Sequence, residues 1–338
     1  MGQIERQKTQ ASDIPTLSEL FTLTKTQQFQ LSATNLVAID RKKGCVYKAT
    51  LRSPLNKITD FNSPDIRNLG SKANTLLEIR MLRFLSRNGI NTPKVFGTNK
   101  DSDVFAMEYV EGSTLLDKIL NKTICSGDVV LSANLLGKLH SISKTERNTR
   151  WIKINSRAYP RHFPNRVEGF LDKYNALYNI GNKYLRDAFI EAKKHLDENP
   201  NYMVWNEPVY GDYKPENMIS TKTGTLVFID PGLRMGRASF DLGKFVSRML
   251  LHKCPENLVR AFIKHYQDGA KTPISTREIS FMTALDMVTI LSVYDSISKG
   301  ASAPIFAKRI YKLTNSTERI INEFVLPLLQ SKFELVTV

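Results

Sequence analysis

The 338-residue chain is poor in cysteine and has no long apolar run, and each shortage excludes a class of protein. Its cysteines, Cys45, Cys125 and Cys254, are odd in number and far apart in sequence. Neither a disulfide framework nor a zinc site is therefore expected, and a reducing compartment is the default. No apolar run approaches the roughly 20 residues that cross a bilayer, and the polar N-terminus carries no signal-peptide core. We expect a cytoplasmic protein without a membrane span.

Acidic residues are also scarce relative to basic ones. The chain has 48 Lys and Arg against 33 Asp and Glu, which gives a formal net charge of +15. This balance favours anionic partners, namely a nucleotide, a phosphorylated metabolite, nucleic acid or a membrane surface. A general bias towards Lys and Arg explains the charge equally well. The hydrophobic fraction of 41% is typical of a globular protein.

The most informative stretch covers residues 209–232, VYGDYKPENMISTKTGTLVFIDPG. Two short apolar runs, 218–219 and 226–229, flank a polar turn at 221–225 that contains glycine. Apolar runs separated by a short polar turn are typical of a β-hairpin. The stretch therefore predicts two paired strands.

Oxygen-bearing side chains stand at both ends of this predicted hairpin. Asp212 and Asn217 come just before the first strand, and Asp230 comes directly after the second. Because a hairpin brings its two ends together, we expect two carboxylates and an amide oxygen around one point. These are hard ligands of the kind that Mg²⁺ prefers, with coordination positions left for waters and phosphates.

The pattern Gly-Asp-x-x-x-x-Asn, then a hairpin, then Ile-Asp resembles the catalytic and metal-binding segments of kinase-fold phosphotransferases. The closest similarity is to the aminoglycoside phosphotransferase and choline kinase group, which usually has His where this chain has Tyr210. The resemblance implies an α+β, two-lobed protein kinase-like fold. In that fold a small, mainly-β N-lobe with one key helix precedes a larger, mainly-α C-lobe.

The same resemblance implies roles for the residues of the stretch. Asp212 is the implied base, which orients the acceptor hydroxyl and accepts its proton late in the transfer. Lys214 is implied to stabilise the transferring phosphoryl group, as a cation can. Asn217 and Asp230 are the implied ligands of Mg²⁺. The sequence of residues 214–217, Lys-Pro-Glu-Asn, is more similar to that of protein kinases than to that of the small-molecule enzymes.

Earlier in the chain, two strand-like runs at 36–40 and 45–50 are joined by a hairpin turn that ends in Gly44. Lys48 lies on the second run between apolar residues. A lysine on an inner strand face needs an anionic partner, so we interpret Lys48 as the lysine that holds the ATP phosphates. The alternative is an exposed strand lysine.

Residues 71–88 show apolar positions at helical spacing, followed by Gly89 as a terminator. Glu78 lies on this predicted helix. Taken alone, a helical glutamate is usually solvated. The order Glu…Leu…Leu…Gly…Pro resembles the corresponding helix of the phosphotransferase group, and this resemblance implies an ion pair between Glu78 and Lys48.

Two further segments have counterparts in the nucleotide site of the group. The turn at 31–35, where kinases usually place a glycine-rich loop, has no glycine. Ser32 and Asn35 are its expected phosphate donors, beside Thr34. The strand-like run 104–112 resembles the hinge between kinase lobes, and the backbones of Glu108 and Val110 are expected to bind adenine.

The expected organisation has three parts. Residues 1–30 form a polar segment with a short helix from Thr16, residues 31–112 a nucleotide-binding N-lobe, and residues 113–338 a helical C-lobe with the catalytic hairpin and the acceptor site. In the C-lobe, His140 is expected to be structural. Asp241 is expected to cap the backbone of the catalytic segment through N–H bonds.

 Residues 148–167 combine six Arg, Lys or His residues with three aromatic residues. The stretch contains no Asp or Glu. Basic residues interleaved with aromatics can grip phosphates and stack on rings, so one interpretation is part of a site for an anionic or aromatic acceptor. The other is a solvated basic face with aromatics buried beneath it.

These features together predict an ATP- and Mg²⁺-dependent phosphotransferase that acts on a hydroxyl group of a small molecule, such as a sugar, nucleoside, antibiotic or similar metabolite. The basic composition favours a neutral or anionic acceptor. Two alternatives stay open. The first is an atypical protein kinase. The second is a pseudokinase or basic module that binds nucleotide or nucleic acid, although nucleic acid is not the favoured partner.

Overall fold

The chain divides into two units in the computed structural model. The first unit comprises Met1–Glu111 with Val227–Ile229, and the second comprises Gly112–Leu226 with Asp230–Val338. Within them the structure describes residues 13–26, 35–51, 70–143, 145–156, 182–203, 207–270, 273–298 and 317–330. No helix among these residues has both the length and the apolar character that a membrane crossing requires.

The first unit is built on an antiparallel sheet with the strand order β1-β2-β4-β3. Its strands are β1 (Asn35–Asp40), β2 (Cys45–Thr50), β3 (Val95–Thr98) and β4 (Val104–Glu108). The predicted hairpin of β1 and β2 is confirmed, and Gly44 in its turn has φ +63, which glycine adopts without strain. The strand expected over 104–112 is too long, because β4 ends at Glu108.

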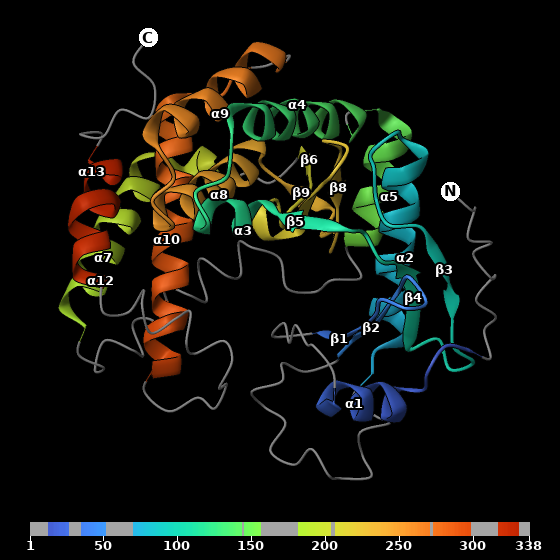
Figure 1. Cartoon of the computed structure of the whole chain (residues 1–338). Helices are drawn as coiled ribbons and strands as arrows, with labels where there is room; N and C mark the ends of the chain where they lie inside the picture. Colours follow the sequence, from blue (N-terminus) through green and yellow to red (C-terminus); the bar gives the residue numbers. More distant parts are fainter. Residues whose placement is uncertain are drawn as a thin grey trace. The chain divides into compact units, whose positions relative to one another are not determined.

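Two helices, α1 (Leu17–Thr26) and α2 (Lys72–Arg87), flank the strands of this sheet (Figure 1). Side chains on a strand point alternately to opposite faces. Tyr47 of β2 belongs to an apolar cluster with residues of α1, whereas Val46 belongs to a cluster with Ile79 of α2. The face of β2 that carries Val46 therefore looks towards α2.

The helix α2 forms where the sequence predicts it. Its N-cap is Ser71, whose hydroxyl accepts a hydrogen bond from the N–H of Asn74 at 3.3 Å. Such a cap satisfies one of the backbone donors that a helix start leaves without an intrahelical partner. The helix ends at the C-cap Asn88, and Gly89 follows with φ +72. Both ends are thus set by local sequence.

The second unit is predominantly helical, as expected (Figure 1). The helix α4 (Ser126–Ser143) packs along α9 (Glu256–Gly269), and α8 (Ala238–Leu251) packs along α10 (Thr276–Ser298). The other described helical segments are α3 (Leu115–Leu120), α5 (Glu146–Ser156), α7 (Lys183–Glu198), 3₁₀ turns at Pro200–Met203 and Pro215–Asn217, α12 (Thr317–Ile320), a π-helical turn at Ile321–Val325 and α13 (Leu326–Leu329).

Short strands occur between these helices. β5 (Gly112–Thr114) pairs with β7 (Met218–Thr221), and β6 (Glu207–Val209) pairs with β9 (Arg234–Gly236), both antiparallel. β8 (Leu226–Phe228) is the neighbour of β7 in the sheet order β5-β7-β8, which confirms the predicted hairpin.

The close packing of α8 on α10 depends on Gly243. A Cβ atom at this position would lie 2.6 Å from the carbonyl carbon of Met282 and 2.7 Å from the nitrogen of Thr283. Real Cβ atoms do not approach backbone atoms so closely. Glycine thus lets the two helix backbones approach. On α8, Phe245 also stacks on Phe262 of α9, with ring centroids 4.2 Å apart.

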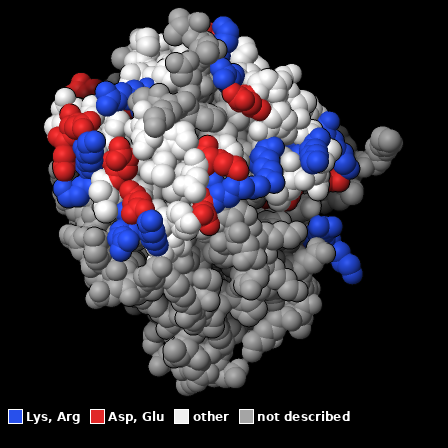
Figure 2. Space-filling model, turned by 90° about the vertical axis from the view of Figure 1, so that its left-hand side faces the viewer, with Lys and Arg blue, Asp and Glu red and all other residues white. Residues whose placement is uncertain are grey.

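Charges of both signs are interleaved on the described surface shown in Figure 2. Exposed ion pairs four residues apart occur along described helices: Lys193–Asp197, Arg260–Glu256, Lys264–Asp268 and Arg319–Glu323. Exposed pairs of this kind contribute little to stability. On this face of the described residues, the excess of basic residues is not gathered into a patch of one sign.

Candidate active site

Lys48 and Glu78 form a buried ion pair in the first unit. Lys48 lies on the same face of β2 as Val46, because the two are separated by two positions, and this face carries it towards α2. Its Nζ atom lies 2.6 Å from Glu78 Oε1, and the two side chains are only 4% and 6% exposed. Thr50, two positions further along β2, donates its hydroxyl to Glu78 Oε2 at 3.2 Å. The expected pairing of strand lysine with helix glutamate is thus present.

The other residues expected at the nucleotide site differ in whether the structure describes them and in how exposed they are. Ser32 lies outside the described residues, and Asn35 is a buried residue at the start of β1. Glu108 ends β4, and its N–H donates to the carbonyl of Lys94 at 2.8 Å. A contact of Glu108 with adenine would therefore use its carbonyl. Val110 follows in irregular, partly exposed backbone.

In the second unit, residues 210–217 form a loop, the 210–217 loop, which begins where the pairing of β6 with β9 ends. Val209 is in register with Arg234. Gly211 has φ +80, and a Cβ there would lie 2.6 Å from the carbonyl oxygen of Gly232. Only glycine fits such backbone. The chain therefore turns sharply just before Asp212.

Asp241 holds this turn from the first turn of α8. Its fully buried carboxylate accepts the N–H of Tyr210 at 2.7 Å and the N–H of Gly211 at 2.8 Å. His140 Nε2 lies 3.1 Å from the same carboxylate, and His140 Nδ1 lies 2.8 Å from the hydroxyl of Tyr266. The structural roles predicted for Asp241 and His140 are confirmed.

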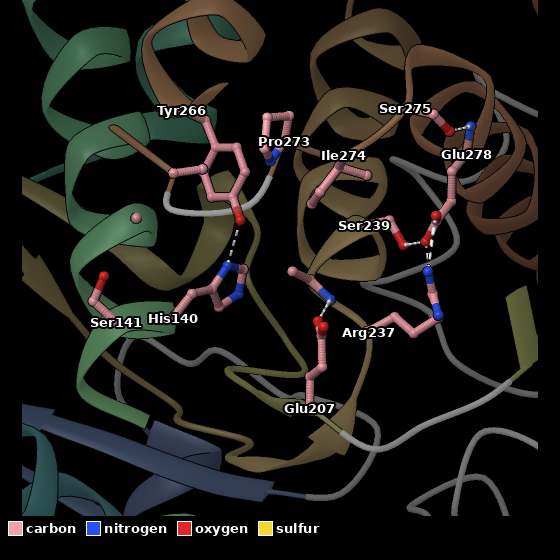
Figure 3. A pocket seen from close by; sticks show the side chains of 13 residues that line it. His140, Ser141, Glu207, Arg237, Ser239, Tyr266, Pro273, Ile274, Ser275 and Glu278 are labelled. Carbon is pink, nitrogen blue, oxygen red and sulfur yellow. Dashed lines mark hydrogen bonds and ion pairs between the residues drawn. The ribbon is translucent and has the colours of Figure 1, made fainter. Parts of the chain in front are cut away.

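A small polar cavity of about 170 Å³ lies against this support (Figure 3). His140 and Tyr266 line one side of it, with their hydrogen bond visible in Figure 3. Glu207 and the ion pair between Arg237 and Glu278 line another side. Its lining includes no residue of the 210–217 loop.

Both oxygens of Asp212 are engaged by side chains. Lys244 Nζ lies 2.6 Å from Oδ1, and Lys214 Nζ lies 2.8 Å from Oδ2. The amide nitrogen of Asn217 donates to Oδ2 at 2.9 Å and to the Asp212 carbonyl at 3.0 Å. The carboxylate, 27% exposed, is thus held at three points.

The two ammonium groups control the charge of Asp212. The surrounding protein on its own would raise the pKa of this carboxyl, because burial disfavours the charged form. Lys214 and Lys244 outweigh that effect and hold the pKa of Asp212 well below its usual range. Burial, together with the nearby cations Lys214 and Arg234, lowers the pKa of Lys244 despite its contact with Asp212. Asp212 is therefore a carboxylate at neutral pH.

Lys244 belongs to a polar stripe on α8 that our sequence interpretation missed. Residues 241, 244 and 248 lie three and four positions apart, which places them on one face of the helix. Arg248 lies 3.0 Å from Glu216 of the 210–217 loop and 3.3 Å from Asp286 of α10. The spacing from Asp241 was the signal that could have identified Lys244, because Asp241 already faced the loop.

Asp230 follows β8 and adopts φ +55, the left-handed region that few residues other than glycine occupy. Aspartate is among the residues that tolerate it, and such conformations cluster at functional sites. Burial raises the pKa of Tyr210 well above its usual value, and the nearby carboxylates of Asp230 and Asp212 raise it further.

The residues present fit a magnesium ion that is shared with phosphates. The amide nitrogen of Asn217 is held by Asp212, so its amide oxygen points away from Asp212. An amide oxygen and the Asp230 carboxylate are hard donors that suit Mg²⁺. In the described ranges, no three His, Cys, Asp or Glu side chains gather as a metal cage. Phosphate oxygens and waters would complete the coordination of such an ion.

The basic stretch 148–167 is only partly described. Residues 148–156 belong to α5, where Ile152 is buried and Arg150 is exposed, whereas 157–167 lie outside the described residues. The helical part therefore fits an exposed basic face over a buried apolar position. The interpretation of the stretch as part of an acceptor site stays a prediction.

Comparisons with known proteins give one family and a set of related folds. The family model described as "Phosphotransferase enzyme family" matches residues 64–277. No curated protein sequence matches the chain.

Three solved structures illustrate the similarity in fold. A choline/ethanolamine kinase family protein from Mesorhizobium loti is 13% identical, with 90% of this chain and 92% of that chain covered and a TM-score of 0.56. An aminoglycoside phosphotransferase from Alicyclobacillus acidocaldarius is 16% identical, with 90% and 92% covered and a TM-score of 0.52. The choline kinase LicA from Streptococcus pneumoniae is 17% identical, with 93% and 98% covered and a TM-score of 0.53; another structure of LicA contains AMP. The predicted fold class is confirmed.

Proposed function

The chain belongs to the phosphotransferase enzyme family, and we propose that it transfers the γ-phosphate of ATP to a hydroxyl group of a small molecule. The observation that carries this proposal is the arrangement around Asp212. Its carboxylate is held by Lys214, Lys244 and Asn217, and a second carboxylate, Asp230, acts together with Asp212 on the pKa of Tyr210. A base and metal-binding oxygens in one place suit phosphoryl transfer.

Asp212 acts on the acceptor in this proposal. Its carboxylate accepts a hydrogen bond from the acceptor hydroxyl and directs the oxygen towards the γ-phosphorus. The new O–P bond forms as the bond from phosphorus to the leaving ADP oxygen breaks, and the hydroxyl proton passes to Asp212. Because the two lysines keep the pKa of Asp212 low, this proton moves late, after the attacking oxygen has lost electron density to phosphorus.

Nucleotide binding is assigned to the first unit and magnesium to the second. Lys48, oriented by Glu78, would bind the α- and β-phosphates of ATP, and the backbone of residues 108–110 would bind adenine. Asn217 and Asp230 would hold Mg²⁺, which supplies charge neutralisation to the phosphates. The AMP complex of LicA, a protein of similar fold, supports the use of an adenine nucleotide.

A small-molecule acceptor is favoured over a protein. Only residues 231–237 separate Asp230 from α8, and three of them form β9. This segment is too short for the activation segment through which protein kinases are regulated. The ammonium groups of Lys214 and Lys244 beside Asp212 favour a neutral or anionic acceptor over a polycation, because like charges repel.

The test is a transfer screen with γ-labelled ATP and Mg²⁺ against pooled sugars, nucleosides, phosphorylated metabolites, peptides and aminoglycosides. We expect label in a small hydroxyl compound and none with Asp212→Asn, which should still bind ATP. Label in peptides alone would favour the atypical protein kinase. Nucleotide binding without transfer to any pool would favour the pseudokinase, and salt-sensitive binding of nucleic acid would favour the basic binding module.

A further inference from the structure

We propose that Lys244 is a positioning residue for Asp212, so that the proposed base is aimed by a lysine of the helix α8 rather than by its own loop alone. This inference rests on the proposed function. It starts from the 2.6 Å contact between Lys244 Nζ and Asp212 Oδ1. That contact engages the carboxylate oxygen for which the 210–217 loop supplies no partner among the described hydrogen bonds and ion pairs.

The two oxygens of Asp212 are held from different elements. Oδ2 meets Lys214 and Asn217, which lie two and five positions further along the same loop. Contacts at Oδ2 alone restrain the carboxylate from one side only, because hydrogen bonds tolerate a range of angles at the acceptor oxygen and so let the side chain tilt. Lys244 at Oδ1 removes this freedom, because it approaches from a separate helix. The plane of the carboxylate, and with it the direction in which it accepts the acceptor hydroxyl, is then fixed.

Lys244 is itself held where rearrangement is costly. Its side chain is only 11% exposed, and its ammonium lies 5.3 Å from the centre of the Phe240 ring, a favourable cation–π distance. Asp286 of α10 contributes a second negative charge nearby. The close approach of α8 to α10 at Gly243 brings this carboxylate into range. The position of Lys244, and with it that of the Asp212 carboxylate, therefore depends on the packing of α8 against α10.

The same helix holds the two sides of the base. Asp241 accepts the N–H groups of Tyr210 and Gly211, directly before Asp212, and Lys244 holds the Asp212 side chain three positions later on α8. The backbone and the side chain of the base are thus both held by the same helix, α8. Sites held on helices are more precise than sites held on loops alone.

The kinetic test uses Lys244→Ala, with Lys118→Ala as the matched control. Lys118 Nζ lies 2.6 Å from Asp128 in the same unit, so its loss also breaks a lysine–aspartate pair, but away from Asp212. In Lys244→Ala we expect kcat to fall on the order of 100-fold, while the KM for ATP stays unchanged. In Lys118→Ala we expect kcat to stay unchanged. Propylammonium, which replaces the deleted atoms, should restore activity in a saturable way. An unchanged kcat, or a loss that propylammonium does not restore, would overturn the proposal.

A crystal structure of Lys244→Ala decides the positioning without any activity. We expect the Asp212 carboxylate to turn about its Oδ2 side while Asp241 and the backbone of the 210–217 loop keep their places. An unchanged carboxylate would overturn the proposal even if the enzyme is active. Absence of transfer by the wild-type protein would instead reject the proposed function, and the crystal structure would still decide the role of Lys244.

Discussion

Replacement of Asp241 by asparagine tests the support of the proposed base. Asparagine keeps the shape of the side chain but offers one acceptor oxygen instead of two. If that oxygen stays with Tyr210 and His140, the new NH₂ group faces the N–H of Gly211, which the carboxylate accepts at 2.8 Å. Loss of one charge-assisted bond and burial of an unsatisfied donor cost about 1–3 kcal/mol each and overlap in part, so we expect about 2–4 kcal/mol of destabilisation.

The assay combines urea unfolding with steady-state kinetics. The backbone directly before Asp212 would shift, and a displacement near 1 Å costs about 100-fold in rate, so kcat should fall while the KM for ATP is kept. Asp128→Asn is the control, because Asp128 is also buried and accepts hydrogen bonds from Lys118, Cys125 and Ser220 away from Asp212. It should lose stability but keep kcat. An Asp241→Asn protein as stable as wild type, or as active, would refute the reasoning.

Three further predictions concern other parts of the chain. Lys48→Met removes the ammonium partner of the buried Glu78 and should cost about 3–5 kcal/mol, measured by urea unfolding. Lys48→Met combined with Glu78→Leu should recover most of this loss. Gly243→Ala should destabilise the folded protein by about 1–3 kcal/mol, because the new Cβ clashes with α10. Gly137→Ala in α4, where a Cβ meets nothing within 4 Å, should instead stabilise it by about 0.5–1 kcal/mol. Equal melting temperatures of the two variants would contradict this contrast. Asp230→Asn keeps a side chain that tolerates the left-handed backbone, so it should weaken Mg²⁺ binding, measured by calorimetry, without loss of stability. Asp230→Ala should weaken Mg²⁺ binding and also lower the stability of the protein.

Local patterns predicted much of the fold. The hairpin of β1 and β2 and the helix α2 follow from short-range signals, namely alternating apolar residues, turn glycines and the cap at Ser71. The three-residue strands β5, β6 and β9 were not predicted, because so short a strand has no periodicity to detect. Their pairing is determined by tertiary contacts, and β4 ends before the expected position for the same reason.

The candidate site divides along similar lines. The ion pair of Lys48 with Glu78 was expected from a resemblance, and the structure has it at 2.6 Å. The contact of Lys244 with Asp212 was not expected, because it joins positions 32 residues apart that only the packing of α8 against the 210–217 loop brings together. Sequence motifs identify the reacting groups, but they do not reveal which distant side chains hold those groups in place.

The division of the chain has a consequence for the way the protein is made. The first unit includes Val227–Ile229, and the N–H of Phe228 donates to the carbonyl of Asn91 at 2.8 Å. A ribosome that has finished Glu111 must still synthesise the chain through Ile229 before this bond can form, a delay of roughly 5–25 s at typical rates. The first unit is therefore completed late, after the Gly112–Leu226 part of the second unit has already been synthesised. A fragment that ends at Glu111 would lack these residues, so nucleotide binding has to be measured on the full chain.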